Sequence, residues 1–322
     1  MLNLVKTFKI KDVKSEEKNL DLVNFKKMSQ DALKNKYAIG AYNFVNLEVL
    51  KAIVETANEC NSPVVVQAST GAIRYMGLNT IVPMLKSLKS KVKVCLNLDH
   101  GQTFEDCKNA IDAGFTNVMI DGSHLPYEEN VKLTKKVVDY AHKFDVTVEG
   151  ELGTIGGKED DVSGQIHYTD PTQALDFVKR TGVDSLAIAI GTSHGPNKFS
   201  GEAHLRIDIL VQIEKLMPKI PLVLHGASSV PKFLKDYALS TGMAIQKANG
   251  VPEDILKECA THNICKINVD SDLRIAYTAG VREILNSTPE CIDIRTYNKN
   301  GMTKVKELIA HKMKDVFLTS RS

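Results

Sequence analysis

Short runs of β-branched and apolar residues recur along the chain, spaced widely enough for one strand, one helix and two loops. Eight such runs stand at residues 37–43, 63–69, 93–99, 117–121, 146–152, 185–191, 221–226 and 264–270. Amphipathic stretches such as 47–60, 104–114 and 129–144 lie between them. Near-continuous apolar strands that alternate with helices indicate a parallel sheet covered on both faces. Eight such units, with no Gly-x-Gly-x-x-Gly loop at the first helix, favour an α/β fold of the closed (β/α)8 TIM-barrel type over a doubly wound sheet.

Length, charge and cysteine use fit one such barrel. The 322 residues contain no apolar run of the roughly 18 residues that would indicate a membrane span. The 41 basic and 39 acidic side chains leave a net charge of +2, which gives no sign of nucleic acid or a membrane as a partner. The six cysteines form no Cys-x-x-Cys pair, so we expect reduced thiols in a cytoplasmic protein. Residues 1–22 have no apolar signal segment, so we expect an N-terminal extension there and one barrel domain over residues 23–322.

Polar residues and glycines gather at the carboxyl ends of the predicted strands. They are Asn43, Ser69, Asp99, His100, Gly101, Asp121, Glu149, Glu151, residues 191–195, His225, Gly226 and residues 268–272. In a barrel these strand ends meet on one face, and that face carries the active site. The sequence therefore predicts an enzyme rather than a purely structural protein.

Three histidines of this face, His100, His194 and His225, each follow an apolar strand and have glycine neighbours. One histidine after a strand is equally well explained as a surface residue beside a helix cap. Three imidazoles on one rim, with a fourth position open, are the ligand set of a catalytic zinc site. Their shared placement therefore favours a metal centre, while the other six histidines fall mostly in helices or loops.

Glycine- and serine-rich segments follow the last three predicted strands, within residues 191–198, 225–230 and 266–274. Small residues let backbone N–H groups approach an oxygen-rich ligand, and barrels often bind phosphate near the last two strands. Lys198 would add a positive charge there. A further glycine- and acid-rich segment, 150–164, is either an ordinary solvated loop or a mobile loop that brings a general base over the site.

Together these segments resemble the class II, zinc-dependent fructose-1,6-bisphosphate aldolases over roughly residues 23–310. The motifs are LDHG (98–101), MIDGSH (119–124), VEGELGTIGGKED (148–160), VDSLAIAIGTSHG (183–195), PLVLHGAS (221–228) and KINVDSD (266–272). The resemblance implies reversible cleavage of fructose 1,6-bisphosphate into dihydroxyacetone phosphate and glyceraldehyde 3-phosphate, a step of glycolysis and gluconeogenesis. Tagatose-1,6-bisphosphate aldolases share most of these motifs and are the alternative.

The resemblance also implies roles for individual residues. The three histidines bind Zn²⁺, and Asp99 handles the proton on the C4 oxygen of the sugar. Glu159 exchanges the proton on the carbon of dihydroxyacetone phosphate, although its neighbour Lys158 replaces an acidic or neutral residue of many relatives. Asp121 and Glu151 match positions that hold an alternative or second metal ion.

Substrate binding is likewise implied by the resemblance. The first phosphate is bound by Gly195, Lys198, Gly226, Ser228, Asn268 and Ser271, with Ser69 nearby, and we count Asn43 among the substrate-binding residues. The carbonyls of Gly195 and Gly226 also match the site of a monovalent cation, Na⁺ or K⁺. Asp270 and Arg274 match the residues that select fructose over tagatose. Arg295 matches an arginine that reaches the second phosphate across a subunit interface, which implies a homodimer or homotetramer.

Three other functions fit parts of the pattern. A lysine such as Lys266 could form a Schiff base in an aldolase that needs no metal. A metal-dependent barrel hydrolase would carry a His-x-His pair at the end of its first strand, where this chain has Ala41, Tyr42 and Asn43. A non-catalytic phosphosugar-binding protein would retain the fold without needing the full set of catalytic groups.

Overall fold

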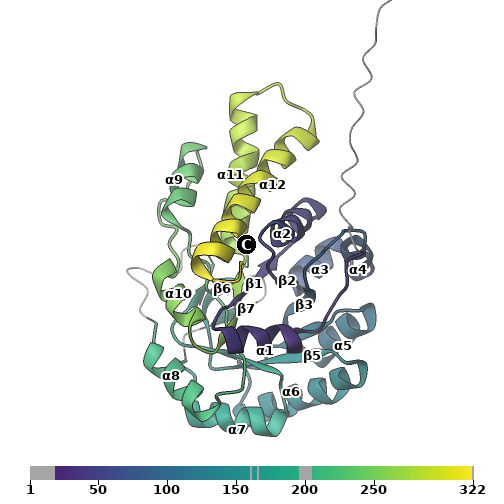
Figure 1. Cartoon of the computed structure of the whole chain (residues 1–322), viewed down its shortest axis with the longest axis vertical. Coiled ribbons are helices and arrows are strands. Elements are labelled where there is room, and N and C mark those ends of the chain that lie inside the picture. The colour runs from purple at the N-terminus through teal and green to yellow at the C-terminus, as the bar shows by residue number, and fades with distance from the viewer. Residues whose placement is uncertain (1–18, 160–161, 165–166, 196–204, 321–322) are drawn as a thin grey trace, which may run out of the picture.

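The computed structural model describes residues 19–320 except 160–161, 165–166 and 196–204, and it describes no side chains within 157–166. Eight parallel strands close into a barrel in which neighbours in sequence are neighbours in space (Figure 1). They are β1 (Ile39–Asn43), β2 (Val64–Ser69), β3 (Val94–Gly101), β4 (Asn117–Ile120), β5 (Thr147–Leu152), β8 (Ser185–Ile188), β10 (Leu222–Leu224) and β11 (Ile264–Val269). Each overlaps one predicted run, so the (β/α)8 prediction is confirmed.

Helices surround this barrel. They are α2 (Leu47–Glu59), α3 (Thr70–Met76), α4 (Leu78–Lys86), α5 (Phe104–Ala113), α6 (Tyr127–Ala141), α7 (Pro171–Thr181), α8 (Ile207–Leu216), α9 (Lys232–Ser240), α10 (Glu253–Ala260), α11 (Ser271–Ser287) and α12 (Ile294–His311), with short turns η1 (His142–Phe144) and η2 (Lys312–Val316). Side-chain caps such as Asn46, Thr103 and Asp170 start several of them by accepting a backbone N–H of the first turn. No helix in the described part of the chain has both the length and the apolar character to cross a membrane.

The first helix, α1 (Phe25–Asn35), lies across the barrel (Figure 1). Its apolar side chains Phe25 and Met28 are buried in one cluster with Ala41, Val65 and Cys95 of the barrel strands. This cluster lies near the amino ends of the strands, so α1 keeps water out of the barrel from the side opposite the polar strand ends.

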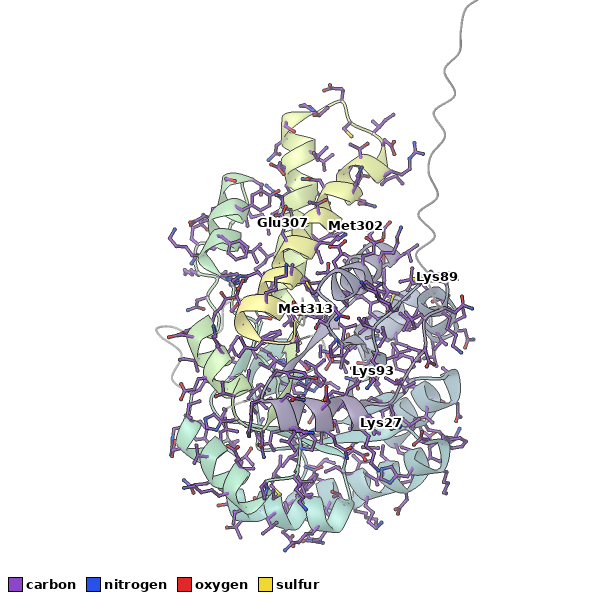
Figure 2. The ribbon with its side chains drawn as sticks, viewed as in Figure 1. Lys27, Lys89, Lys93, Met302, Glu307 and Met313 are labelled. Carbon is purple, nitrogen blue, oxygen red and sulfur yellow. The ribbon has the colours of Figure 1, made fainter. Side chains whose placement is uncertain are left out.

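Helices α11 and α12 form a pair that projects from the barrel (Figure 1). They cross closely at Gly280 and Gly301, because a Cβ atom added to Gly280 would lie 2.8 Å from the Gly301 Cα atom. Figure 2 shows Met302 and Glu307 on α12 and Met313 just after it, where the chain returns to the barrel. The segment that connects the two helices, residues 288–293, therefore lies away from the barrel, at the far end of the pair.

Candidate active site

Three imidazoles meet at the carboxyl ends of the strands. His100 belongs to β3, His194 to β9 (Ser193–His194), and His225 directly follows β10. All three are buried, and the His100 ring centroid lies 4.6 Å from that of His225 and 5.2 Å from that of His194. The structure thus brings together three histidines that are far apart in sequence.

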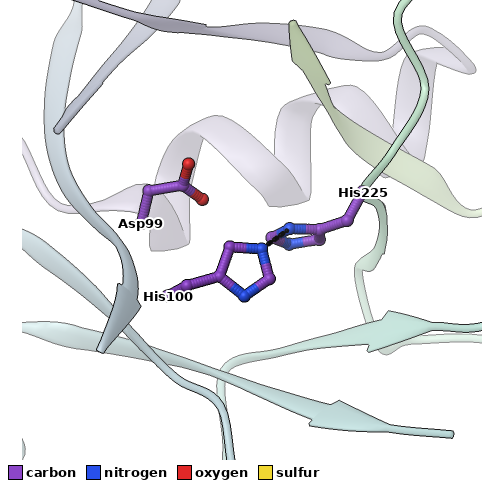
Figure 3. A group of neighbouring side chains, drawn as sticks. All are labelled: Asp99, His100 and His225. Carbon is purple, nitrogen blue, oxygen red and sulfur yellow. Dashed lines mark hydrogen bonds between the residues drawn. The ribbon is translucent and has the colours of Figure 1, made fainter. Parts of the chain in front are cut away.

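A carboxylate behind two of these rings fixes which nitrogen carries the proton. His100 Nδ1 lies 3.0 Å from Asp121 Oδ2, and His225 Nε2 lies 2.6 Å from Glu149 Oε1. A carboxylate accepts hydrogen bonds, so each of these nitrogens donates and leaves the other ring nitrogen with a lone pair. Those two lone-pair nitrogens, His100 Nε2 and His225 Nδ1, face each other at 2.9 Å (Figure 3). A proton shared between these two nitrogens, or a metal cation bound to both, offsets the repulsion of their lone pairs.

The electrostatics of the site favour positive charge. Burial alone would lower the pKa of His100, but the hydrogen bond that His100 donates to Asp121 and the charges of Asp99, Asp121 and Glu151 raise it to about 10. Burial would raise the pKa of Asp121, and its bonds and charge interaction with His100 lower it well below the usual range. Burial and the neighbouring Asp121 raise the pKa of Glu151.

The ligand atoms of Asp99, His100 and His225 lie within 4.8 Å of one another, and so do those of His100, Asp121 and Glu151. Converging nitrogen donors, with carboxylates that orient them, match the ligands and supporting residues of a zinc site. The residues present therefore fit a divalent metal ion.

Asp99 lies beside this cluster with both of its carboxylate oxygens held. Asn43 donates from Nδ2 to Asp99 Oδ2 at 2.7 Å, and Asn268 donates from Nδ2 to Asp99 Oδ1 at 3.1 Å. Both are bonds to a charged acceptor in a buried setting, where such bonds are strongest. The carboxylate of Asp99 is therefore fixed in position next to the three imidazoles.

A hollow opens beside Asp99 and contains most of the predicted substrate residues. It is lined by Asn43, Asp99, His194, Gly226, Ala227, Ser228, Asn268, Asp270 and Ser271. Ser271 begins α11, so the hollow also meets the positive end of a 17-residue helix. Backbone N–H groups, small residues and this helix end form a place suited to an anion.

The remaining predicted residues lie in different places. Ser69 caps α3 by accepting the Ala72 N–H at 3.1 Å and does not line the hollow. Arg274 pairs with Asp270 at 2.7 Å, one helical turn away at the rim. Gly195 is the last residue described before the gap at 196–204, and its φ of 86° is in the region that favours glycine.

Arg295 lies far from the hollow in this chain. It is 90% exposed, pairs with Asp293 at 2.9 Å and stands at the start of α12. Helix α11 leads from the hollow to the connection before Arg295, and its 17 residues span about 25 Å at 1.5 Å each. Lys198 and the side chain of Glu159 lie outside the residues that the structure describes.

The segment after β5 forms strands where the sequence predicted a loop. Strands β6 (Gly156–Glu159) and β7 (Val162–Gly164) pair antiparallel, and β6 pairs in parallel with β9. The register places Gly157 opposite His194. Two short, glycine-rich strands have no detectable period, and the partner strand is distant in sequence, so no local pattern revealed this small sheet.

Glu149 and Lys266 form a fully buried ion pair that sequence reasoning missed. Lys266 Nζ lies 2.8 Å from Glu149 Oε2, while the other Glu149 oxygen holds His225. The Lys266 amine is held by this pair and does not line the hollow beside Asp99, where a Schiff base with the substrate would form. This geometry argues against Lys266 as a Schiff-base lysine and makes Glu149 a support for His225.

Comparison with known proteins agrees with this geometry. A family model described as class-II fructose-bisphosphate aldolase matches residues 23–321. The chain is 45% identical to a fructose-bisphosphate aldolase of Treponema pallidum over 321 residues, covering 93% of this chain and 97% of the relative. It is 44% identical to a fructose-bisphosphate aldolase of Staphylococcus aureus, covering 94% and 100%. Among solved structures, the YdjI aldolase of Escherichia coli K12 superposes with a TM-score of 0.78 at 31% identity, covering 94% and 99%.

Proposed function

The chain belongs to the class-II fructose-bisphosphate aldolase family, and we propose that it cleaves fructose 1,6-bisphosphate reversibly into dihydroxyacetone phosphate and glyceraldehyde 3-phosphate. It is an enzyme of the carbon–carbon lyase class. Its named relatives are fructose-bisphosphate aldolases, and none of these names supports the tagatose alternative. The observation that carries the proposal is the pair of carboxylate-anchored imidazoles, His100 and His225, beside Asp99.

The family implies a divalent metal, and we assign it as Zn²⁺ with His100, His194 and His225 as ligands. The ligand atoms of His100 and His225 already converge, whereas the ring centroid of His194 lies 5.2 Å from that of His100 and 6.4 Å from that of His225. When bound, Zn²⁺ acts as a Lewis acid that withdraws electron density from the ketose oxygens next to the bond that breaks. Asp121 and Glu151 would hold an alternative or second metal ion. The carbonyls of Gly195 and Gly226 would hold a Na⁺ or K⁺ ion.

Asp99 removes the proton from the C4 hydroxyl, and this drives cleavage of the C3–C4 bond. The amide groups of Asn43 and Asn268 hold its carboxylate in place for this step. In the condensation direction Asp99 returns the same proton. Its position between the imidazole cluster and the hollow supports this role.

Glu159 is proposed to move the proton at the carbon of dihydroxyacetone phosphate. The support is the position of its strand, because β6 pairs with β9 beside His194. The general base and the general acid of the two half-reactions thus come from different elements, β3 and β6. This separation lets each group act on a different carbon of the substrate.

The first phosphate would occupy the hollow and fix the sugar relative to Asp99. Its ligands would be Gly226, Ser228, Asn268 and Ser271 from the hollow, together with Gly195 and Lys198 and with Ser69 nearby, while Asn43 would contact another part of the substrate. Asp270 and Arg274, paired at the rim, would contact the far part of the substrate and favour fructose. Binding energy from these unreactive parts places the C3–C4 bond for cleavage.

Arg295 would reach the second phosphate of a neighbouring subunit's substrate, because its own hollow is about 25 Å away along α11. The assembly is accordingly proposed to be a homodimer or homotetramer. We also propose that residues 1–22 form an extension to a single barrel domain over residues 23–322, since the family match begins at residue 23. The enzyme would act in glycolysis in the cytoplasm, without nucleic acid or membrane as partner.

Metal analysis combined with a cleavage assay tests this proposal. The purified chain should contain about one Zn²⁺, should cleave fructose 1,6-bisphosphate in preference to its C4 epimer tagatose 1,6-bisphosphate, and should lose activity in EDTA. Borohydride added with substrate should leave it active. Activity that survives EDTA but not borohydride would overturn the metal mechanism in favour of a Schiff base, and a preference for tagatose would overturn the assigned substrate.

A further inference from the structure

Five polar side chains form a row inside the barrel. They come from five neighbouring strands, and each residue is paired with the next residue of the row on the adjacent strand. Asn43 of β1 is paired with Gln67 of β2, Gln67 with Asn97 of β3, Asn97 with Asn117 of β4, and Asn117 with Thr147 of β5. Asn43 is the last residue of β1, whereas Thr147 is the first residue of β5. The row therefore descends from the site to the amino end of the barrel.

These five side chains form one unbroken chain of hydrogen bonds. Thr147 Oγ1 donates to Asn117 Oδ1 at 2.6 Å, and Asn117 Nδ2 donates to Asn97 Oδ1 at 2.7 Å. Asn97 Nδ2 donates to Gln67 Oε1 at 3.1 Å, and Gln67 Nε2 donates to Asn43 Oδ1 at 2.7 Å. Every bond has its donor on the Thr147 side, so the chain has one direction.

The carboxylate at the site end of the chain requires this direction. At the upper end Asn43 donates to Asp99, and a carboxylate can only accept. At the lower end the backbone N–H of Phe25, the first residue of α1, donates to Thr147 Oγ1 at 3.1 Å. That N–H belongs to the positive end of α1, whose first N–H groups have no partner within the helix. One flipped amide would place two oxygens or two NH₂ groups face to face, so each amide is held by its neighbours and, through them, by Asp99.

The fold itself does not require polar groups at this level. The side chains one layer nearer the amino end, Ala41, Val65 and Cys95, are apolar and pack against α1. Buried amides contribute little to stability compared with apolar side chains of the same shape, although an unpaired one is costly. The row of hydrogen-bonded polar side chains that ends at Asp99 is therefore better explained by a role in the active site than by a role in stability.

We propose that Gln67, Asn97, Asn117 and Thr147 are positioning residues that fix the Asn43 amide and, through it, the carboxylate of Asp99 at the C4 hydroxyl. This inference rests on the role of Asp99 in the proposed function. Primary amides neither gain nor lose protons at ordinary pH, so the chain holds Asp99 in place and does not deliver a proton to it. Thr147 is the informative residue, because its hydroxyl donates the last bond of the chain at the end remote from the substrate.

Thr147→Val tests the inference, because valine has the shape of threonine without the hydroxyl. We expect kcat for cleavage of fructose 1,6-bisphosphate to fall about tenfold with KM changed less than about twofold, since Asp99 loses alignment while the phosphate hollow is intact. Thr147→Ser, which keeps the hydroxyl, should restore kcat to within about twofold of the wild type. The matched control is Thr181→Val on α7, where an equally buried hydroxyl donates to the Phe177 carbonyl outside the barrel.

A second readout separates positioning from general damage. Exchange of the carbon-bound proton of dihydroxyacetone phosphate with deuterated water uses Glu159 in the proposed mechanism and does not need Asp99. The ratio of cleavage to exchange should therefore fall about tenfold in Thr147→Val and stay at the wild-type value in Thr147→Ser and Thr181→Val. All variants are compared as full-length chains with equal metal content.

Two outcomes would overturn the inference. One is a Thr147→Val enzyme with wild-type kcat, and the other is a parallel loss of cleavage and exchange, which indicates structural damage only. If valine prevents folding, Thr147→Ala also lacks the hydroxyl and is judged by the same ratio. A wild-type chain that does not cleave the substrate would instead refute the proposed function, so the two failures are distinguishable.

Discussion

His225 Nδ1 lies 2.9 Å from His100 Nε2, and the opposite nitrogen of each ring is bonded to a buried carboxylate. The carboxylates, Asp121 and Glu149, each accept a hydrogen bond from the far side of a ring and so turn the other nitrogen of each ring toward its neighbour. This relationship explains how two histidines from distant strands become a ligand pair. The predictions on metal binding follow from it.

Replacing His225 should remove the metal and the activity together. In His225→Ala we expect zinc content below about a tenth of the wild-type value and a loss of cleavage activity of about a thousandfold or more, because two protein ligands do not hold a catalytic zinc tightly. Elemental analysis and a cleavage assay measure both. His262→Ala is the control, since His262 pairs with Glu214 away from the site. Full activity without bound metal would contradict the assignment.

Asp121→Asn should weaken metal binding without abolishing it. The asparagine can still accept from His100 Nδ1, but it lacks the charge that makes the ring a stronger ligand, so we expect zinc affinity to fall by about 10–100-fold. Competition with a chromogenic chelator measures the change. Asp315→Asn, next to Nδ1 of His311 on the outer surface, is the matched control and should leave the affinity unchanged.

Lys312→Met should be strongly destabilising. The fully buried ammonium of Lys312 lies 2.7 Å from Asp272, which also accepts the backbone N–H groups of Ser229 and Val230 beyond β10. Without the lysine, Asp272 is left as a buried charge that lacks its cation, and the free energy of unfolding should fall by about 3–5 kcal/mol. Urea denaturation measures it.

The control for Lys312 is Lys232→Met, because Lys232 is 88% exposed and pairs with Asp236 at the surface. Its free energy of unfolding should change by less than about 1 kcal/mol. An equal, small effect of both substitutions would show that the buried pair does not stabilise the protein.

The contact between His311 and Glu253 should stabilise the fold only in a window of pH. The hydrogen bond with Glu253 raises the pKa of His311 above 6.5, so this contribution is complete below pH 6.5 and is lost as pH rises through the raised value. Burial would raise the pKa of Glu253, but His311 and Lys312 lower it below 4.5, so its contribution is lost as pH falls through the lowered value.

Stability measured against pH tests this window. The difference in free energy of unfolding between the wild type and His311→Gln should be largest between pH 4.5 and 6.5, at about 1 kcal/mol or less for this partly exposed pair, and should shrink above it. A difference that grows as the pH rises past neutrality would contradict the assigned shift. His142→Gln, whose exposed ring pairs with Asp184, is the comparison variant.

Much of the barrel was predictable because its strands are local signals. Runs such as 93–99 and 221–226 are apolar and β-branched, and their spacing leaves room for one helix between each pair. The candidate metal ligands could be named for a related reason: His100 and His225 each stand at a strand end, and parallel barrel strands put all such ends on one face. These conclusions need only the order of residues and the geometry of regular structure.

Partners across the barrel could not be predicted. Nothing near Glu149 in sequence indicates that one of its oxygens holds His225 and the other Lys266. The same is true of the pairing of β6 with β9 and of the row from Thr147 to Asn43.

The sequence alone determined the eight barrel strands, the fold class and the face that carries the candidate site, because periodicity and strand ends are properties of neighbouring residues. Only the tertiary structure decided which buried polar groups meet, since the register and closure of the barrel choose one partner for each group among many of equal chemistry. The choice matters energetically because a buried donor, acceptor or charge without a partner costs about 1–3 kcal/mol or more. His100 and His225 show both: their positions at strand ends could be read from the sequence, whereas their carboxylate partners, Asp121 and Glu149, are known only from the tertiary structure.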